Sequence, residues 1–210
     1  MTKLLIFGAS GHTGRLVVGE ALAAGHTVTA FVRDPAKLAQ TTNGLTLFKG
    51  DVRRPDDVTR ALAGQEVVVS VLGFANTVRD PELVAAFAAI VAEMQRQQVN
   101  RLIYLSSLGV PGGKAPLSWF VRAFIVPTFL RYALADHTAD ERVIRASSLV
   151  WTIVRPPRLT DGPKRGTYRH GTAIRTEKLV AGLSRADLAE FLVGLVGSNA
   201  YRREAVTITD

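Results

Sequence analysis

The sequence predicts an α/β protein with a doubly wound, mostly parallel sheet and helices on both faces. Three observations support this fold class. Short apolar runs rich in β-branched residues recur along the chain, amphipathic stretches separate them, and a glycine-rich loop follows the first run. Alternating strands and helices build a parallel sheet that is covered on each side. The 210 residues, 47% of them hydrophobic, suit one domain over residues 1–210 with a large core.

The expected strands are short segments rich in β-branched or aromatic residues. Lys3–Phe7 is apolar and runs directly into glycine, which is typical of a buried parallel strand. The other expected strands, most of them bounded by turn-forming residues, are His26–Val32, Leu45–Phe48, Glu66–Val71, Arg101–Leu105, Leu149–Val154 and the C-terminal Ala205–Thr209.

The expected helices lie between these strands and before the last one. Thr13–Ala24 stops at Gly25, a common C-terminal helix signal. A later helix over Ser184–Val196 begins at Ser184, a suitable N-cap, and carries Asp187 near its positive end. The remaining expected helices are Pro55–Ala63, Pro81–Gln97 and part of Leu117–Ala146.

One apolar segment, Leu117–Ala135, is nearly long enough to cross a bilayer. Arg122 and Arg131 would be costly at that depth, and Pro127 interrupts the helix. We therefore expect no transmembrane segment, but a broken, partly exposed helix over the active site or a subunit contact, in a monomer or a homodimer; peripheral membrane contact is a further alternative. The first residues form too short an apolar run for a secretory signal, so we expect a cytoplasmic protein.

Composition excludes some chemistries and leaves others open. The chain has no cysteine, which removes disulfides, thiolate metal sites and cysteine nucleophiles, and no cluster of other ligands has metal-binding spacing. The net charge is +8, and residues 155–175 carry six basic side chains against one acid, Asp161. This segment suits a solvated surface, a nucleic acid, an anionic membrane or a phosphorylated small molecule. Because no RNA-type aromatic platform is interleaved with it, we expect no nucleic-acid partner.

The loop Gly8–Gly14 (GASGHTG) joins the first expected strand to the first expected helix. Glycines allow a pyrophosphate to approach the backbone closely, and a helix N-terminus supplies free N–H groups and a positive dipole end. The spacing is GxxGxxG without a GK[ST] ending, which disfavours a nucleoside-triphosphate loop. The loop therefore predicts a dinucleotide site.

The end of the second strand indicates which dinucleotide is bound. An NAD site usually has an acidic residue there to accept from the ribose 2′-OH. This strand instead ends at Arg33, with Lys37 one turn further on, and two cations suit a 2′-phosphate. Asp34 could itself reach a ribose, but before Pro35 it is better placed to cap the following turn. We expect NADP(H) rather than NAD(H).

Six motifs together resemble the atypical short-chain dehydrogenase/reductases. They are GASGHTG at Gly8–Gly14, VRDPAKL at Val32–Leu38, GDV at Gly50–Val52, SVLG at Ser70–Gly73, LSS at Leu105–Ser107 and VRPPRLTDG at Val154–Gly162. Within that group the likeness is to NAD(P)H-binding proteins of the biliverdin reductase B/flavin reductase type, next to the NmrA-like regulators. It implies a Rossmann fold with strand order 3-2-1-4-5-6 and NADPH across the carboxyl ends of the strands.

The resemblance also implies the residues that bind the cofactor. The pyrophosphate would be held by the loop residues Gly8, Ser10, Gly11, His12, Thr13 and Gly14. On the adenosine side, Arg33 and Lys37 would hold the 2′-phosphate, and Asp51 with Val52 would border the adenine. Along the inner half of the cofactor would lie Leu72, Gly73, Phe74, Ser106, Ser107, Pro156 and Pro157. The substrate side would be built from residues 107–146 and 155–185.

The chain departs from better-known relatives at positions that carry chemistry. The Tyr-x-x-x-Lys pair is absent, since Tyr132 is followed four places later by Asp136, so ketone chemistry loses its usual acid. Arg158 stands where flavin-reductase-like relatives have a histidine, and Ala75 or Asn76 stands near the position of an arginine of theirs. These differences disfavour biliverdin as the substrate.

Hydride transfer to a flat acceptor needs few groups from the protein, because the cofactor carries the reactivity. Ser107, or Ser106, is the candidate hydrogen-bond donor, and Arg158 is the candidate electrostatic partner of an anionic, FMN-like acceptor. His137 is a weaker candidate acid, and Tyr104 is expected in the core. The sequence favours an NADPH-dependent reductase of flavins, quinones or similar acceptors; the alternative is a non-catalytic NADP(H) sensor like the NmrA-type proteins.

Overall fold

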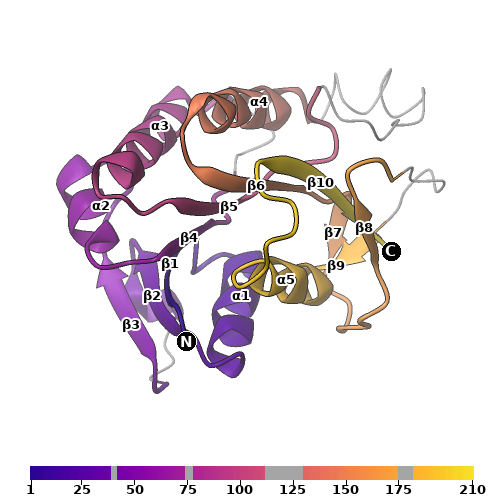
Figure 1. The fold of residues 1–210 in the computed structure, drawn as a ribbon, viewed down its shortest axis with the longest axis horizontal. Helices are drawn as coiled ribbons and strands as arrows, with labels where there is room; N and C mark the ends of the chain where they lie inside the picture. Colours follow the sequence, from indigo (N-terminus) through magenta and orange to yellow (C-terminus); the bar gives the residue numbers. More distant parts are fainter. Residues whose placement is uncertain (39–41, 74–77, 112–129, 175–181) are drawn as a thin grey trace.

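An eight-stranded sheet forms the centre of the computed structural model, which describes residues 1–38, 42–73, 78–111, 130–174 and 182–210 (Figure 1). The strands lie in the order β3-β2-β1-β4-β5-β6-β10-β8. Their bounds are β1 Lys3–Phe7, β2 Thr27–Val32, β3 Leu45–Lys49, β4 Val67–Ser70, β5 Arg101–Leu105, β6 Val150–Arg155, β8 Arg169–Gly171 and β10 Glu204–Thr209. Every neighbouring pair is parallel except β10 with β8. The predicted order 3-2-1-4-5-6 with an added C-terminal strand is confirmed.

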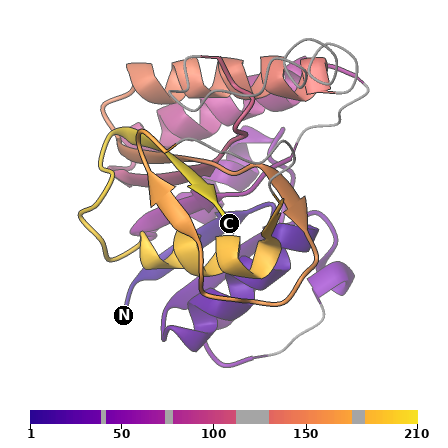
Figure 2. The same ribbon diagram turned by 90° about the vertical axis from the view of Figure 1, so that its right-hand side faces the viewer.

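Helices cover both faces of this sheet. Their bounds are α1 His12–Ala23, α2 Pro55–Leu62, α3 Pro81–Arg96, α4 Arg131–Ala146 and α5 Arg185–Gly194, with a short 3-10 turn, η1, at Pro35–Leu38. α1 and α5 lie together on one face, and α2, α3 and α4 lie on the other (Figure 1). A view turned by 90° shows the sheet between α3 and α4 on one side and α5 and α1 on the other (Figure 2).

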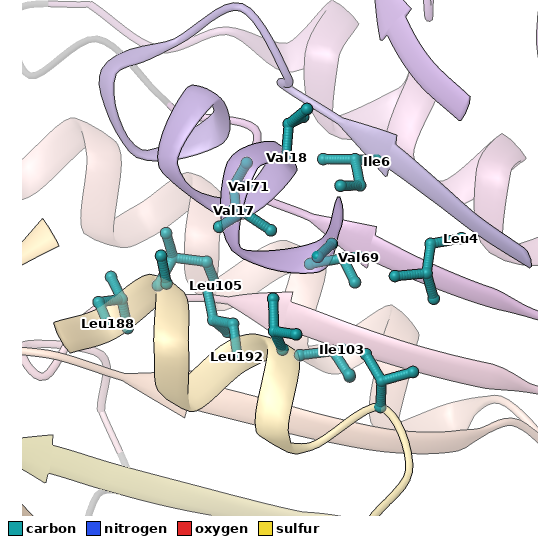
Figure 3. Close-up of a cluster of buried hydrophobic side chains, with 14 of the residues drawn as sticks. Leu4, Ile6, Val17, Val18, Val69, Val71, Ile103, Leu105, Leu188 and Leu192 are labelled. Carbon is teal, nitrogen blue, oxygen red and sulfur yellow. The ribbon is translucent and has the colours of Figure 1, made fainter. Parts of the chain in front are cut away.

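The core on the face of the sheet toward α1 and α5 consists mainly of apolar side chains (Figure 3). Alternate residues of the central strands point to it because successive side chains of a strand point to opposite faces. The core joins Leu4, Ile6, Val69, Ile103 and Leu105 of the strands, and Val71 directly after β4, to Val17, Val18, Leu188 and Leu192 of the helices. Burial of these side chains holds α1 against the strand ends that precede the glycine loop.

The opposite face has a second core that includes buried polar groups. Phe7 and Tyr104 point to this face, and the Tyr104 ring lies 4.9 Å from that of Phe87 on α3, centroid to centroid. α4 also buries four charged or polar residues on the side that faces the sheet, Asp136, His137, Asp140 and Glu141. Buried ionisable groups of this kind require partners.

Three short strands were not predicted. β8 extends the main sheet, and β7 (Arg158–Thr160) pairs with β9 (Gly182–Ser184) in a separate two-stranded sheet. The predicted N-cap is confirmed: Ser184 precedes α5, and its hydroxyl oxygen accepts from the N–H of Asp187.

The apolar segment Leu117–Ala135 falls mostly outside the described residues. Its last five residues begin α4, and residues 117–129 are not among those described. Within the described part of the chain, no helix combines the length and the apolar character needed to span a bilayer.

Candidate functional site

The carboxyl end of β1 passes directly into the glycine loop at Gly8. This residue has a φ of +80°, a conformation that side chains disfavour. A Cβ atom there would also lie 2.6 Å from the carbonyl oxygen of Val71, which follows β4. Glycine is therefore required where the ends of β1 and β4 approach each other.

The first turn of α1 packs against the same loop through Gly14. A Cβ atom on Gly14 would lie 2.1 Å from the Gly8 carbonyl oxygen and 2.8 Å from the backbone of Ala9. The Gly8 oxygen also accepts from the N–H of Gly11, at 3.0 Å. These contacts fix the direction in which α1 leaves the loop.

The N-terminus of α1 has hydrogen-bond donors without protein acceptors. Gly11 is the N-cap, no side chain caps the helix, and the first turn contains no acid. Among the described residues, the N–H groups of His12, Thr13 and Gly14 have no acceptor. Together with the helix dipole, such donors favour an anion at this position. The loop residues expected to hold a pyrophosphate thus lie around one uncapped helix end.

Two exposed cations follow the carboxyl end of β2. Neither Arg33 nor Lys37 has a side-chain hydrogen bond or ion pair within the part of the chain that the structure describes. Asp34 does cap the following turn, since its Oδ1 accepts from the N–H of Ala36 at 3.1 Å and its carbonyl accepts from Lys37 N–H. The structure therefore confirms the predicted turn and leaves both cations available to an anion.

Asp51 and Val52 lie beside the same edge of the sheet. The N–H of Gly50 donates to the carbonyl of Val32, which places the end of β3 next to the end of β2. Asp51 Oδ1 accepts from the N–H of Arg53, and Val52 is buried. Asp57 on α2 accepts from the N–H of Asp51 and holds this loop in place.

The predicted inner half of the site lies where β4, β5 and β6 end. Ser106 N–H donates to Val154 O, and Leu108 N–H donates to Pro156 O, so the segments after β5 and β6 run side by side. Pro157 is half-buried at the same edge. After β4, Leu72 is half-buried and Gly73 exposed. Phe74, Ala75 and Asn76 lie outside the described residues.

Glu141 on α4 joins the ends of β5 and β6. Its two carboxylate oxygens accept from Arg155 Nε at 2.9 Å and Nη2 at 2.5 Å. The hydroxyl of Ser106 donates to the same carboxylate at 2.7 Å, and Arg145 adds an ion pair. Ser106 thus positions a strand end, and its hydroxyl is already engaged.

Ser107 and Arg158, the two other residues proposed to take part in the chemistry, lie in different surroundings. Ser107 is half-buried, and its hydroxyl has no hydrogen bond within the described chain, so of the two serines it is the one available to a ligand. Arg158 is exposed on β7, with its guanidinium near Gly182 of β9. The contact of Arg158 with an acceptor stays a prediction.

The basic segment 155–175 is less uniformly charged at the surface than its composition suggests. Arg155 is buried in the ion pair with Glu141, and Lys164 pairs with Glu20 and Glu190. The charges of these two residues are therefore paired within the protein. Arg158, Arg165 and Arg169 are exposed.

Sequence reasoning did not predict a buried group of Tyr104, His137 and Asp140. The phenol oxygen of Tyr104 lies 2.7 Å from His137 Nδ1 and 2.9 Å from Asp140 Oδ2. Burial lowers the pKa of His137 to about 4 and raises the pKa of Asp140 to about 8. Burial also raises the pKa of Tyr104, as does the neighbouring Asp140. Burial therefore favours the uncharged form of each of the three groups.

Comparison with known protein families assigns this chain to one of them. The family model described as NAD(P)H-binding matches residues 8–199, and the chain belongs to that family. The resemblance to NAD(P)H-binding, short-chain-dehydrogenase-like proteins is thereby confirmed.

Individual relatives agree with this assignment. ChuY, an anaerobillin reductase from Escherichia coli O157:H7, is 26% identical, with a TM-score of 0.79 over 99% of this chain and 96% of that one. A wide-type short-chain dehydrogenase/reductase from Veillonella parvula, solved with NADP, shares the fold at 18% identity, with a TM-score of 0.82 over 100% of this chain and 94% of that one.

A sequence relative, the isoflavone reductase homolog IRL of Zea mays, is 37% identical over 94 residues, which is 40% of this chain and 30% of that protein. The chain covers between 30% and 61% of the length of the first curated relatives that it matches.

We predict that Gly14→Ala weakens NADPH binding by at least about tenfold and lowers the melting temperature. The added methyl group must displace the Gly8 carbonyl, which turns the α1 donors away from the anion site. Calorimetric titration and thermal unfolding measure the two effects.

Gly19→Ala is the matched control on the same helix. A Cβ atom on Gly19 meets nothing within 4 Å, so this variant keeps its affinity and gains up to about 1 kcal/mol of helix stability. Native affinity in Gly14→Ala would refute the role assigned to this close contact.

Proposed function

We propose that this protein is an NADPH-dependent reductase that transfers hydride to a flavin, a quinone or a similar flat acceptor. The uncapped N-terminus of α1 carries the proposal, because it presents free donors beside the aligned ends of β1, β4 and β5. Membership of the NAD(P)H-binding family and relatives named as reductases support it. The substrate side would comprise residues 107–146 and 155–185.

The preference for NADPH over NADH rests on the charges after β2. Arg33 and Lys37 are exposed and lack protein partners among the described residues, and the neighbouring Asp34 caps the turn. A guanidinium matches the geometry of a phosphate and can donate two hydrogen bonds to it. These residues would hold the 2′-phosphate of the cofactor.

For this reaction the protein must hold an acceptor and stabilise the negative charge that develops on it. A bound nicotinamide cofactor supplies the hydride. Ser107 would donate a hydrogen bond where charge develops, and Arg158 would attract an anionic acceptor. Glu141 supports this arrangement because it fixes the strand ends on which the Ser106–Ser107 and Pro156–Pro157 segments lie.

We predict that Arg33→Ala raises the Kd for NADPH by about 10- to 100-fold and changes the Kd for NADH by less than about twofold. The loss corresponds to one charge-assisted contact of roughly 1.5–3 kcal/mol that only the 2′-phosphate makes. Calorimetric titration with each nucleotide measures it, and Arg202→Ala, an exposed arginine before β10, is the control. Equal losses for the two nucleotides would refute the 2′-phosphate assignment.

We predict that NADPH absorbance falls when FMN, FAD or a quinone is added, and that Ser107→Ala slows this turnover by about 100-fold. Ser148→Ala removes the hydroxyl of an exposed serine and should have no effect. Arg158→Ala should raise KM most for the anionic acceptor FMN.

Tight NADPH binding without oxidation by any of these acceptors would contradict the reductase. That result would instead support the sensor of the NmrA-like type.

A further inference from the structure

Charged side chains join the starts of the three helices on the polar face of the sheet. α3 lies between α2 and α4 on this face (Figure 1). α2 follows β3, α3 follows β4, and α4 ends shortly before β6 begins. Because each of these helices runs back from the carboxyl edge of a parallel sheet, all three begin near that edge, where the dinucleotide and its acceptor are proposed to bind.

The connection begins in the loop that is expected to border the adenine. Asp51 Oδ1 accepts from the N–H of Arg53 at 3.0 Å, which ties the backbone of Arg53 to the expected adenine contact. The Nη2 atom of Arg53 donates to both carboxylate oxygens of Asp80, at 2.9 Å and 3.2 Å. A charge-assisted hydrogen bond thus joins this loop to the start of α3.

Asp80 passes the connection from the loop to α4. It is the N-cap of α3, and its Oδ1 accepts from the N–H of Leu83 at 2.9 Å. Its own N–H donates to Asp136 Oδ2 on α4 at 3.0 Å. Because the helix that it caps fixes its orientation, Asp80 holds Arg53 on one side and α4 on the other.

Asp136 is a fully buried acid in the first half of α4. Its Oδ2 accepts from the N–H of Asp80, and its Oδ1 accepts from Nε of Arg79. A buried carboxylate requires such partners, and removal of one leaves a costly charge. The start of α4 is therefore held against residues 79–80.

The same helix continues the connection to the acceptor side. Glu141, further along α4, accepts from the Ser106 hydroxyl and pairs with Arg155, and so holds the ends of β5 and β6. Ser107, the proposed donor to the acceptor, directly follows Ser106. Hydrogen bonds and one helix therefore join the adenine loop to the proposed acceptor side.

Building on the reductase function, we propose that Asp80 and Asp136 are positioning residues that couple the adenosine end of the cofactor site to the acceptor side. A ligand on Asp51 and Val52 favours the arrangement in which Arg53 reaches Asp80, and this arrangement also holds the start of α4. The bound cofactor therefore raises the affinity for the acceptor. By linkage, the acceptor raises the affinity for the cofactor by the same factor.

Adenosine 2′,5′-bisphosphate tests the coupling, because it has the adenosine and the 2′-phosphate of NADPH but no nicotinamide. In the wild type, we expect it to slow hydrogen exchange of the backbone amides in the first half of α4. We also expect it to lower the Kd of the oxidised acceptor, taken as whichever of FMN, FAD or a quinone the wild type reduces, by about fivefold or more. The absence of either effect would overturn the coupling.

Asp80→Asn breaks the connection at one bond. Asparagine is also a good N-cap, and the backbone N–H that binds Asp136 is retained, so only the charge that binds Arg53 is lost. The Kd of adenosine 2′,5′-bisphosphate should change by less than about threefold, and its effects on α4 and on the acceptor should disappear. Effects equal to those of the wild type would overturn the proposal.

Arg96→Gln is the matched control on the same helix. It removes the exposed ion pair between Arg96 and Glu93 in the last turns of α3, away from the carboxyl edge of the sheet. Both effects of adenosine 2′,5′-bisphosphate should remain in this variant. Their loss would show that any change in α3 abolishes them, which would overturn the specific role of Asp80.

Asp136→Asn tests the connection at α4, because it removes the charge that binds Arg79. We expect the acceptor KM to rise by about tenfold, with kcat and the NADPH Kd changed by less than about threefold. Arg79→Lys keeps a cation for Asp136 and should stay close to the wild type. An NADPH affinity that falls as much as the acceptor affinity would indicate general destabilisation and overturn the positioning role.

The double variant asks whether the two acids act in one connection. If they do, Asp80→Asn combined with Asp136→Asn should raise the acceptor KM no more than the more severe single substitution. Losses that multiply would show independent contributions and overturn the coupling.

The hydrogen-exchange measurement separates this proposal from the reductase function, since it needs neither acceptor nor turnover. Unchanged exchange in α4, in protein that still reduces an acceptor with NADPH, would overturn the coupling alone. Wild-type protein that binds adenosine 2′,5′-bisphosphate but reduces no acceptor would overturn the reductase itself.

Discussion

The Gly8 carbonyl oxygen occupies the space that a side chain on Gly14 would need, and the geometry of the site depends on this contact. It sets the angle at which α1 leaves β1, and the apolar core under α1 and α5 holds the helix at that angle. As a result the uncapped N–H groups lie at the edge where β4 and β5 also end. An anion bound there meets donors that need no rearrangement.

The two faces of the sheet contribute in different ways. The face toward α1 and α5 is mainly apolar and serves stability, and its buried Arg101 donates to the Thr152 hydroxyl and the Leu195 carbonyl. The face toward α4 buries Glu141 with Arg155 and Ser106, and removal of one member of such a pair costs roughly 3–5 kcal/mol because the other charge remains buried. This arrangement makes the ends of β5 and β6 rigid, and a rigid edge is what positioning of an acceptor over a cofactor requires.

Much of the fold could be predicted from local patterns. The alternation of apolar runs and amphipathic stretches predicted the doubly wound sheet, and the family resemblance implied its strand order. The turn at Asp34 and the cap at Ser184 followed from residue types at fixed spacing. β7, β8 and β9 are three residues each, too short for a periodic pattern. The partners of Glu141 and Tyr104 were missed because they come from elements distant in sequence. Polar residues at helical spacing between Ala133 and Ile144 were the available signal.

Calorimetric titration of the wild-type protein with NADPH and with NADH tests the central claim most directly, namely that the end of β1 and the start of α1 bind a dinucleotide pyrophosphate. The account predicts a saturable binding heat with a stoichiometry of one nucleotide per chain and a lower Kd for NADPH than for NADH. It also predicts that inorganic pyrophosphate competes with either nucleotide, because the uncapped helix end recognises the shared diphosphate. No heat from either nucleotide at millimolar concentration would contradict the account.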